Sequence, residues 1–549
     1  MQPRFDPAWI VRMTDDYVVV DKPAGVATQP EEKGLRCDLT SLLRAYLRER
    51  GEPDGIGVHQ RLDRETSGLL LFSRTRKASV PIAHAFEARA VEKEYVAGVV
   101  GDPGPDRVLR HRLGERMHGL VRVDPKGKDA VTELRVLARR GDRALVALRP
   151  HTGRTHQLRV QLADVGAPIA GDPLYGAHPA SRMLLHATRL AVPYAGGELR
   201  FESRLPPEFE RFLEGEEAVD VTDRAAFAAC LERALHRRGA LFAPPEGTPL
   251  TDAFRLFHRH GDGAPEIAID RYGDYAVLHA YEDEGALELD AVIASLASLG
   301  FRGGYLKRRR RETEKPAAAV HEALAPEAPV FGEAAPFELE IHEHGIAYPV
   351  RLGDGLSTGI FLDQRENRRR LFQVSPGRSV LNLFAYCGAF TVAAVEGGAE
   401  HTLTVDAARP AIERARGSVL GRNPAGEHRF LVEDVFALLP RLARRGERFD
   451  HVVVDPPTHA RTKKHRFHSG KDWVGLAAAC ARLVSPGGSL WASTNDHRMD
   501  PRGFERFLRR GIEEAGRGVI GRKVFGPPID FPQVPGLPPH QKTVVLTIA

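Results

Sequence analysis

The chain has 549 residues, of which 42% are hydrophobic and 28% are charged. This composition is typical of a soluble globular protein, so it excludes a largely disordered chain. The length is too great for one ordinary core and predicts about three or four domains. A formal net charge of +5 is compatible with a polyanionic partner but does not identify one.

The sequence shows no signal for secretion, membrane insertion or disulfide formation. Its N-terminus has no apolar signal core, and Asn382 and Glu396 interrupt the most membrane-like run, residues 379–399. The scattered cysteines without CxxC spacing are Cys37, Cys230, Cys387 and Cys480. This pattern fits a reducing cytoplasm and argues against a zinc site. We therefore expect a cytoplasmic protein with neither a metal ion nor a membrane partner.

In the N-terminal part, residues 61–68 read RLDRETSG and run into the apolar segment 69–72, which is typical of a buried strand. This string puts Asp63 between Arg61 and Arg64. A carboxylate at such a place must be kept ionised by cationic neighbours, because an unpaired buried charge is too costly. The string therefore indicates a site residue.

Further strings accompany this one in a set order. They are DKPAG at 21–25, KEY at 93–95, TGRTHQLRV at 152–160 and GDPLYG at 171–176. Together with RLDRETSG they resemble the RluA-type pseudouridine synthases over roughly residues 10–205, although Gln60 stands where that family usually has histidine. The resemblance implies an α+β pseudouridine synthase domain, which we place at residues 1–212.

The resemblance also implies residue roles. Asp63 is expected to act as a nucleophile on the sugar carbon or the ring of a flipped-out uridine, without any cofactor. Tyr95 is expected to stack on the target base, with a core role as the alternative. Arg159 is expected to pair with Asp63 through its guanidinium fork, with phosphate binding as the alternative. The expected substrate-binding residues are Arg61, Arg64, Arg154, His156 and Gln157.

A second unit follows a cluster of prolines and charges at 205–220, which predicts a domain boundary. The expected elements are a helix at 221–239, strands at 254–257 and 267–275 joined by a turn at 261–263, and a helix at 286–299. Residues 312–336 are rich in Pro, Ala and Glu and are interpreted as a second linker. We expect a small α/β domain at 218–336.

The densest basic run, KRRRR at 307–311, lies in this unit. A solvated helix or loop face and a contact with an RNA backbone are both open interpretations of it.

From Phe337 onwards the pattern changes to a hairpin and then to alternating strands and helices. Segments 337–341 and 346–350 around His344-Gly345 predict the hairpin. Six strands are then expected at 379–384, 402–406, 428–432, 450–455, 488–493 and 542–548. Such alternation predicts a Rossmann-like, doubly wound α/β sheet with helices on both faces, which we place at 337–549.

Acidic side chains end successive strands of this expected sheet, at the edge where doubly wound folds bind cofactors. Asp406 ends the second strand and can accept both ribose hydroxyls of a nucleoside. Asp434 ends the third and is placed for an adenine amine, while Asp455 ends the fourth before two prolines. Ordinary strand-end capping is the alternative for Asp406 and Asp455.

These residues and the string STGIFLDQRENR at 357–368 resemble the class I S-adenosylmethionine (SAM)-dependent methyltransferases. The resemblance is closer to the RlmI/RlmK-like group acting on large-subunit rRNA and covers about residues 250–549, with the pseudouridine synthase replacing that group's usual PUA domain. It implies SAM as cofactor. The implied cofactor-binding residues are Asp363, Arg365, Asn382, Phe384, Tyr386, Gly388, Asp406, Asp434, Asp455 and Pro456. Asp455 is also an expected catalytic residue, and the expected base-binding residues are Pro457, Thr458 and Asn495.

The expected methyl acceptor follows from the cysteines. Methylation of cytosine C5 requires a cysteine thiolate, but the positions where RNA methyltransferases carry it hold Thr458 and the segment 493–495 here. Cys387 and Cys480 are not well placed. Similarity to the RlmK-like branch implies guanine N7 as acceptor, with N2 next.

The sequence therefore predicts a bifunctional enzyme that modifies RNA, with rRNA as the expected partner. Two alternatives stay open: one domain is catalytically silent and only binds RNA, or the methyl acceptor is a protein or small molecule.

Overall fold

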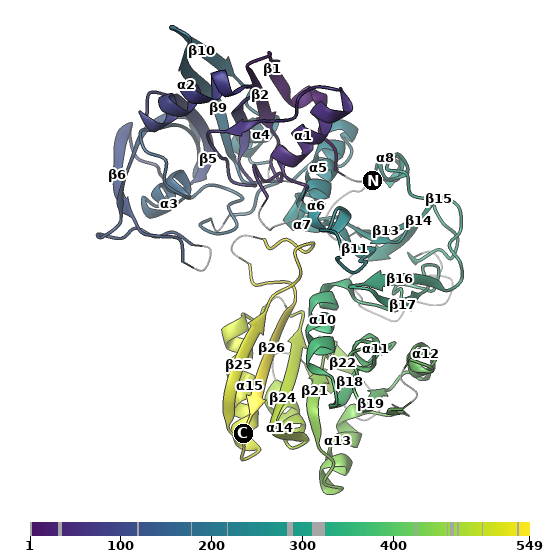
Figure 1. The fold of residues 1–549 in the computed structure, drawn as a ribbon. Coiled ribbons are helices and arrows are strands. Elements are labelled where there is room, and N and C mark those ends of the chain that lie inside the picture. The colour runs from purple at the N-terminus through teal and green to yellow at the C-terminus, as the bar shows by residue number, and fades with distance from the viewer. Residues whose placement is uncertain are drawn as a thin grey trace.

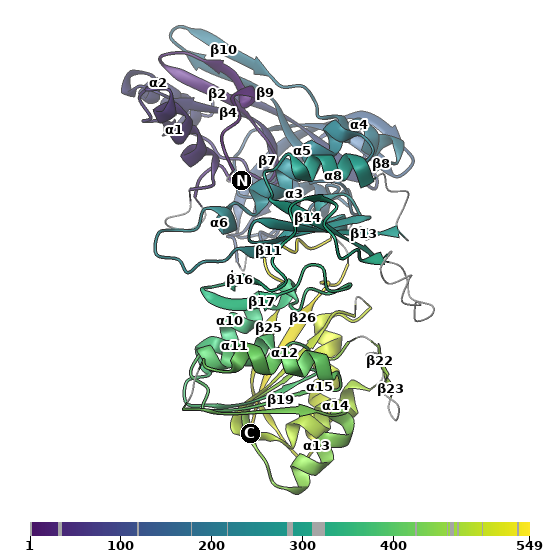
Figure 2. The same ribbon diagram turned by 90° about the vertical axis from the view of Figure 1, so that its right-hand side faces the viewer.

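The structure is a computed structural model in which three regions, each built around β-strands, follow one another along the molecule (Figures 1 and 2). It describes residues 3–30, 36–117, 120–176, 178–216, 218–282, 289–309, 324–422, 425–457, 459–461, 466–468, 472–496, 498–534 and 537–549. The N-terminal strands lie at one end and the C-terminal sheet at the other, with the middle of the chain between them (Figure 2).

The N-terminal strands are β1 (Ile10–Met13), β2 (Tyr17–Lys22), β3 (Gly57–Val58), β4 (Ser67–Ser73), β5 (Glu92–Val100), β6 (Arg107–Leu113), β7 (Lys128–Arg140), β8 (Arg143–Pro150), β9 (Leu185–Tyr194) and β10 (Gly197–Glu202). Within the described residues they form a ten-stranded sheet in the order β1-β2-β4-β9-β5-β8-β7-β6, with β3 on β4 and β10 on β9. Among the described strands of this sheet, β4 and β9 alone pair in parallel, at Ser67 and Gly68. Gly68 has φ 113°, and a Cβ there would lie 2.3 Å from the Ala187 carbonyl oxygen, so this close pairing requires glycine.

Helices cover both faces of this sheet. They are η1 (Pro7–Trp9), α1 (Leu39–Glu49), α2 (Arg76–Glu87), α3 (Gln157–Asp164) and α4 (Pro207–Glu214). Leu70 and Phe72 of β4 pack in one cluster with residues of α1, whereas Leu69 and Leu71 pack in another with Ile82 of α2. Burial on both faces explains why β4 is an unbroken apolar run rather than an alternating one.

The middle region contains a five-stranded sheet in its described part. Its strands, in sheet order, are β11 (Ala253–His258), β12 (Ile267–Tyr272), β13 (Tyr275–Tyr281), β14 (Gly303–Arg309) and β15 (Phe331–Gly332). Its helices are α5 (Arg224–Arg237), α6 (Gly239–Phe242), α7 (Arg259–Asp262) and α8 (Leu289–Ala297). The turn expected at 261–263 is instead the end of α7, which Gly263 terminates with φ 100°. The expected linker at 312–336 contains β15, and residues 310–323 lie outside the described part.

In the described part of the basic run, residues 307–309, all three side chains contact protein groups. Lys307 lies on β14 with its side chain fully buried, and its Nζ donates to the Gly355 carbonyl oxygen. Arg308 forms a 3.0 Å ion pair with Glu282, and Arg309 donates to the Leu356 carbonyl oxygen at 2.7 Å. Lys307 is a buried cation and needs such a partner, whereas the Arg308 side chain is 35% exposed. The rest of the run lies outside the described residues.

The hairpin expected after residue 337 is confirmed by β16 (Leu339–Glu343) and β17 (Ile346–Val350), which pair antiparallel. His344 and Gly345 form its turn with φ 51° and 82°, as expected for a two-residue turn with both central residues at positive φ.

The remaining C-terminal strands are β18 (Ser379–Leu383), β19 (His401–Asp406), β20 (Glu427–Val432), β21 (Phe449–Val454), β22 (His459–Arg461), β23 (Arg466–His468), β24 (Val484–Thr494), β25 (Val519–Phe525) and β26 (Lys542–Ile548). Seven of them form a sheet in the order β20-β19-β18-β21-β24-β26-β25, as far as the chain is described. The first five strands in that order run parallel, and β26 and β25 add on antiparallel. All six expected strands are present, and β25 is an addition.

Helices cover both faces of this sheet as well, which confirms the expected doubly wound fold (Figure 1). They are η3 (Leu362–Gln364), α10 (Arg365–Val374), α11 (Ala389–Glu396), α12 (Arg409–Val419), α13 (Val435–Arg444), α14 (Trp473–Ala481) and α15 (Pro501–Glu514). Leu381 and Leu383 of β18 pack with α13, α14 and α15, whereas Val380 packs with α10 and α11 on the opposite face.

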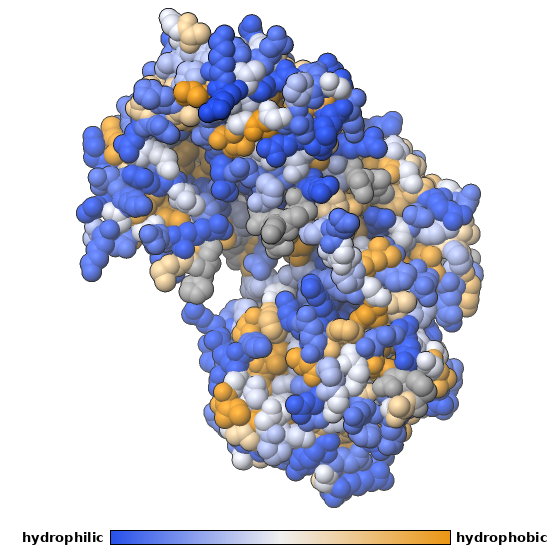
Figure 3. Space-filling view, viewed as in Figure 1, coloured by the Kyte–Doolittle hydropathy of each residue, from blue (hydrophilic) through white to orange (hydrophobic). Residues whose placement is uncertain are grey.

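The middle region contacts both of its neighbours. The loop between β25 and β26 reaches up to it, where Arg238 donates to the Asp530 carbonyl oxygen at 2.7 Å (Figure 1). On its other side, α5 lies against the loop that joins β3 to β4. Hydrophilic side chains dominate the face shown in Figure 3, with hydrophobic ones scattered among them. Of the helices described here, none is long and apolar enough to cross a membrane.

Candidate active sites

The first candidate site lies in the loop between β3 and β4, which carries Asp63. Buried hydrogen bonds from Thr28 and Lys22 hold the backbone of this loop in place. Thr28 Oγ1 donates to the Leu62 carbonyl at 2.8 Å and accepts from the Leu62 amide at 3.1 Å. Lys22 Nζ donates to the carbonyl oxygens of Val26 at 2.7 Å and Arg64 at 3.0 Å. Burial lowers the pKa of Lys22 to about 7.

The cation that contacts Asp63 is Arg159 of α3. Its Nη1 donates to Asp63 Oδ2 at 2.8 Å, while Nε and Nη2 each donate to an oxygen of Asp172 at 2.7 Å. Asp172 is completely buried, whereas the Asp63 side chain is 35% exposed. The buried carboxylate therefore orients the guanidinium, and the guanidinium orients a carboxylate that a substrate can reach.

Tyr95 and His156 complete this site. Tyr95 lies on β5, and burial together with the negative charge of Asp63 raises the pKa of its phenol, so it stays neutral. His156 adopts a left-handed conformation with φ 55° before α3, and its Nδ1 lies 2.8 Å from the Tyr175 hydroxyl. Its Nε2 is 3.8 Å from Asp63 Oδ2, and burial lowers the pKa of the imidazole.

The second candidate site lies at the carboxyl ends of β18, β19 and β21. The turn after β18 has Phe384, Tyr386 and Gly388 at φ 53°, 49° and 75° and leads into α11. Asp406, at the end of β19, accepts from the Tyr386 amide through Oδ2 and from the Ala408 amide through Oδ1, both at 2.9 Å. Asp406 thus joins the loops that follow two neighbouring strands.

Asp455 brings a second carboxyl group to this edge. Its Oδ2 accepts from Gln364 Nε2 at 2.8 Å. Burial and repulsion by Asp363 raise the pKa of Asp455 to about 7, against the smaller effects of Gln364 and Arg368. A site where two carboxyl groups meet in this way favours a cationic ligand. The sulfonium and ammonium groups of SAM fit this requirement.

Comparison with known proteins identifies both halves of the chain. Residues 16–164 match the family model of RNA pseudouridylate synthases, and residues 322–538 match that of S-adenosylmethionine-dependent methyltransferases. Putative ribosomal RNA large subunit methyltransferase YwbD of Bacillus subtilis is 32% identical over 58% of this chain and 78% of its own. Ribosomal RNA large subunit methyltransferase I of Salmonella arizonae is 30% identical over 58% of this chain and 78% of its own.

The chain belongs to the ribosomal RNA large subunit methyltransferase family. It also contains a pseudouridylate synthase domain, so both predicted family resemblances are confirmed and the protein is an enzyme with two catalytic domains. A crystal structure of a putative methyltransferase complexed with SAH is 26% identical, with a TM-score of 0.52, and the match covers 66% of this chain and 88% of that one. SAM is accordingly the cofactor of the methyltransferase domain.

Two residues that the sequence analysis assigned to the cofactor bind protein groups in the structure. The Arg365 side chain is buried and forms a bidentate pair with Asp530 at 2.6 and 3.0 Å. Asn382 lies inside the sheet and donates to Thr391 at 3.0 Å. Both residues brace the methyltransferase fold at positions where direct cofactor contact was expected.

The acidic residue after β20 has a capping role. Asp434 begins α13 by accepting from the amides of Phe436 and Ala437, at 2.8 and 3.3 Å. Strand-end capping was the alternative interpretation of Asp406 and Asp455. The hydrogen bonds that Asp406 accepts from backbone amides are of this kind.

The base-binding residues expected for the methyltransferase follow β21 and β24. Pro456 is buried and Pro457 is exposed directly after Asp455, and Asn495 is exposed just beyond β24. Thr458 lies outside the described residues. Within the described part, the strand ends therefore carry two of the three expected base-binding residues, Pro457 and Asn495, next to the expected cofactor residue Pro456.

In the pseudouridine synthase domain, Arg61 is exposed, whereas Arg64 donates to the Arg237 carbonyl oxygen at 3.3 Å. The cation that contacts Asp63 at 2.8 Å is Arg159, as the resemblance implied. Arg154 Nε donates to the Asp129 carbonyl oxygen at 3.0 Å.

Gln157 is occupied by protein groups instead of facing the site. Its amide donates to Thr132 Oγ1 at 2.9 Å, and its oxygen accepts from Thr152 Oγ1 at 2.8 Å and from the Arg154 amide at 3.0 Å. Its side chain is buried, so it holds the loop that presents His156.

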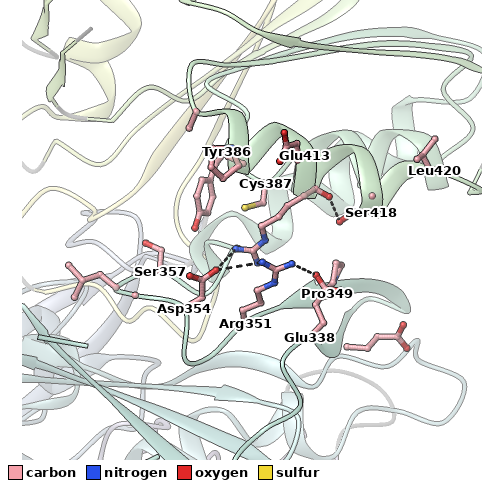
Figure 4. A pocket seen from close by; sticks show the side chains of 18 of the residues that line it. Glu338, Pro349, Arg351, Asp354, Ser357, Tyr386, Cys387, Glu413, Ser418 and Leu420 are labelled. Carbon is pink, nitrogen blue, oxygen red and sulfur yellow. Dashed lines mark hydrogen bonds and ion pairs between the residues drawn. The ribbon is translucent and has the colours of Figure 1, made fainter. Parts of the chain in front are cut away.

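A cavity of about 1050 Å³ adjoins the methyltransferase site without covering Asp455. It lies between the hairpin β16–β17 and α12, and Figure 4 shows Tyr386 and Cys387 on one side of it with Arg351 and Asp354 opposite. Arg351 pairs with Glu338 at 2.8 Å. The cavity reaches the turn after β18 from the side of α12.

Several site residues escaped the sequence analysis. Lys22, Asp172 and Gln364 lie within quoted strings, so their motif was the signal that could have identified them. Asp530 and His540 come from the loop between β25 and β26, and His540 Nε2 lies 3.5 Å from Asp363 Oδ2. Their own segment carries no recognisable pattern.

Proposed function

We propose that this enzyme converts a uridine of large-subunit rRNA to pseudouridine and methylates a guanine of the same RNA class at N7. The first reaction is assigned to a domain at residues 1–212 and the second to a domain at 337–549, with 218–336 between them. The observation that carries the first assignment is the partly exposed Asp63 carboxylate held by the buried pair Arg159–Asp172.

For the pseudouridine reaction, the Asp63 carboxylate attacks the sugar carbon or the ring of a flipped-out uridine. The bond between C1′ and N1 breaks, the uracil turns in the pocket, and C1′ bonds to C5, while the bond to Asp63 breaks and restores the free carboxylate. The proton leaves C5 and N1 gains one, so the product is an isomer and no co-reactant is needed. The other site residues orient the reacting groups and stabilise these steps.

Its neighbours have matching roles. Arg159 orients the carboxylate, and the neutral Tyr95 offers an aromatic face to the base. Arg61, Arg64, Arg154 and His156 lie around the loop for contacts with the RNA, while Gln157 supports His156 from within the fold.

For the methyl transfer, bound SAM supplies an activated methyl group. Asp406 is assigned to the ribose hydroxyls, and the turn from Phe384 to Gly388 lines the cofactor. Asp363 and Asp455 hold its positively charged end. Pro456 is assigned to the cofactor, as is Asp434, which is placed towards the adenine. Pro457, Thr458 and Asn495 are assigned to the target base. Proximity supplies most of the acceleration, because little acid–base chemistry is required.

Guanine N7 is favoured over N2 and over cytosine C5. N7 carries a lone pair that attacks a methyl group directly, whereas cytosine C5 needs a thiolate adduct. Cys480 is buried in α14, where burial raises the pKa of its thiol to about 12, and burial also raises the pKa of Cys387. The observation that favours guanine N7 over cytosine C5 is therefore that the thiols of Cys387 and Cys480 are buried and un-ionised.

Separate loss of the two activities tests the assignment. Asp63→Ala is expected to abolish pseudouridine formation while methylation continues, and Asp406→Ala is expected to do the reverse. Nucleoside mass spectrometry of treated rRNA is expected to show pseudouridine and 7-methylguanine. Pseudouridine in the Asp63→Ala reaction, or 5-methylcytosine in any reaction, would contradict the proposal.

A further inference from the structure

The loop that carries Asp63 is held by a residue from outside the pseudouridine synthase domain. Glu65 follows Asp63 by two positions, and its carboxylate faces Arg237 at the end of α5. Arg237 Nε lies 3.2 Å from Glu65 Oε1 and Nη2 lies 2.6 Å from Oε2. This two-point contact fixes both the distance and the orientation of the carboxylate.

Arg237 is itself held in place. Its Nη1 donates to the Gly261 carbonyl at 3.1 Å and to Asp262 Oδ1 at 2.9 Å. Asp262 is fully buried and also accepts from Arg238 Nη2 at 2.6 Å and from the His258 amide at 2.7 Å. The guanidinium therefore meets Glu65 from a fixed position rather than from a freely rotating side chain.

Two chain segments next to Asp63, one with Gly25 and one with Arg64, also contact α5. A Cβ at Gly25 would lie 3.1 Å from the Arg233 carbonyl oxygen, so the segment next to Lys22 approaches the helix closely. Arg64 donates to the Arg237 carbonyl oxygen at 3.3 Å, and Lys22 holds the Arg64 carbonyl. Both chain segments that surround Asp63 are thus braced against one helix.

The pair is shielded from water. The side chains of Arg237 and Glu65 are 13% and 20% exposed. Burial by itself raises the pKa of Glu65, but the charge of Arg237 and its hydrogen bonds reverse this and leave the pKa below its ordinary value. Without Arg237 the loop would keep a poorly solvated carboxylate and would rearrange to expose it.

We propose that Arg237 is a positioning residue of the pseudouridine reaction, which acts through Glu65 to hold Asp63 against Arg159. The middle region is then part of the pseudouridine synthase machinery, although Arg237 lies outside both family matches, 16–164 and 322–538. The inference rests on the proposed role of Asp63. A displacement of about 1 Å at a reacting group costs on the order of 10²-fold in rate.

The test uses the full chain, rRNA labelled with tritium at uridine C5, and release of tritium as the readout. Arg237→Ala is expected to lower kcat for pseudouridine formation about 10²-fold with KM unchanged. Arg237→Lys keeps the charge without the fork, so an intermediate kcat is expected. Adding Glu65→Gln to Arg237→Ala is expected to cause little further loss, because both changes remove one contact.

Arg233→Ala is the matched control. Arg233 lies on the same helix and forms a 3.0 Å ion pair with Glu208 of α4, and these side chains are 10% and 20% exposed. This variant removes a pair of similar burial from the same interface and keeps the Arg233 backbone carbonyl that Gly25 approaches, so its kcat is expected to stay near that of the parent. Methylation in the same samples reports that the rest of the chain is folded.

Three outcomes separate the possibilities. An unchanged kcat in Arg237→Ala, with Asp63→Ala inactive, would overturn the positioning role alone. Equal losses in Arg237→Ala and Arg233→Ala would also overturn it, because they would reflect a general weakening of the interface. Activity in Asp63→Ala would instead overturn the proposed function on which the inference rests.

Discussion

At the scale of single residues, Asp455 combines burial with a nearby like charge. Its carboxyl group receives one hydrogen bond from Gln364, while Asp363 repels its charged form. The pKa of about 7 means that the folded protein without cofactor holds a proton that the unfolded chain, with a value near 3.8, releases. Folding stability therefore falls as pH rises between these two values.

We predict that Asp455→Asn stabilises the cofactor-free protein at pH values above about 7 and abolishes methylation. The amide removes the cost of a buried charge, and each kcal/mol corresponds to about 2–4 °C in Tm for a domain of this size. Scanning calorimetry at acidic and alkaline pH measures the effect. The difference from the parent is expected to shrink towards acidic pH, and an equal Tm at alkaline pH would contradict the pKa argument.

At the scale of elements, β14 shows how a basic run becomes part of a core. It pairs parallel with β13 along its whole length, whereas β15 pairs antiparallel with it only at Gly303 and Gly304. Lys307 is fully buried there, and burial together with Arg309 lowers its pKa to about 8. A dense run of charged residues in the sequence therefore does not show whether their side chains face solvent or the protein interior.

We predict that Lys307→Ala lowers Tm without changing the salt dependence of rRNA binding. Its partner, the Gly355 carbonyl, would lose a buried donor, whereas an RNA phosphate contact would not be lost. Neutralising a residue that contacts phosphate would reduce the slope of log affinity against log salt by roughly one. Filter binding across salt concentrations checks this, and a flatter slope in Lys307→Ala would restore the RNA-contact interpretation.

At the scale of the whole molecule, a network of buried ion pairs and hydrogen bonds links one region to the next. Arg237 and Arg238 share Asp262, and Arg238 also binds the Asp530 carbonyl in the C-terminal region. Asp530 in turn pairs with Arg365, next to the Gln364 that contacts Asp455. The middle region thus touches structures that support both active sites.

We predict that Asp530→Ala destabilises the full chain by about 3–5 kcal/mol, because it leaves the buried Arg365 without its carboxylate. Arg302→Ala is the control: its pair with Glu333 is exposed by 59% and 69%, so a change within about 0.5 kcal/mol is expected. Urea unfolding of both variants measures the difference. Similar losses in the two would show that the contact at Asp530 contributes no more than a surface pair.

Two kinds of information were local enough to be predicted from the sequence. Hydrophobic patterning located the six main strands of the C-terminal sheet and the hairpin before it, because strand and helix periodicities are written over a few adjacent residues. Motif strings placed Asp63, Arg159, Asp406 and Asp455, and the structure brings Arg159 onto Asp63 at 2.8 Å. Strand ends and motif residues can both be recognised from the residues next to them in the sequence.

Other features depended on contacts between distant parts of the chain. The sequence does not show that Gln157, Arg365 and Asn382 turn into the fold, because a polar side chain takes whichever partner tertiary packing brings to it. Glu65 and Arg237 are 172 positions apart, and no local pattern links them. The sequence by itself determined the fold class and the chemistry of both sites, whereas tertiary structure alone decided which side chains face the substrates and which hold the sites in place.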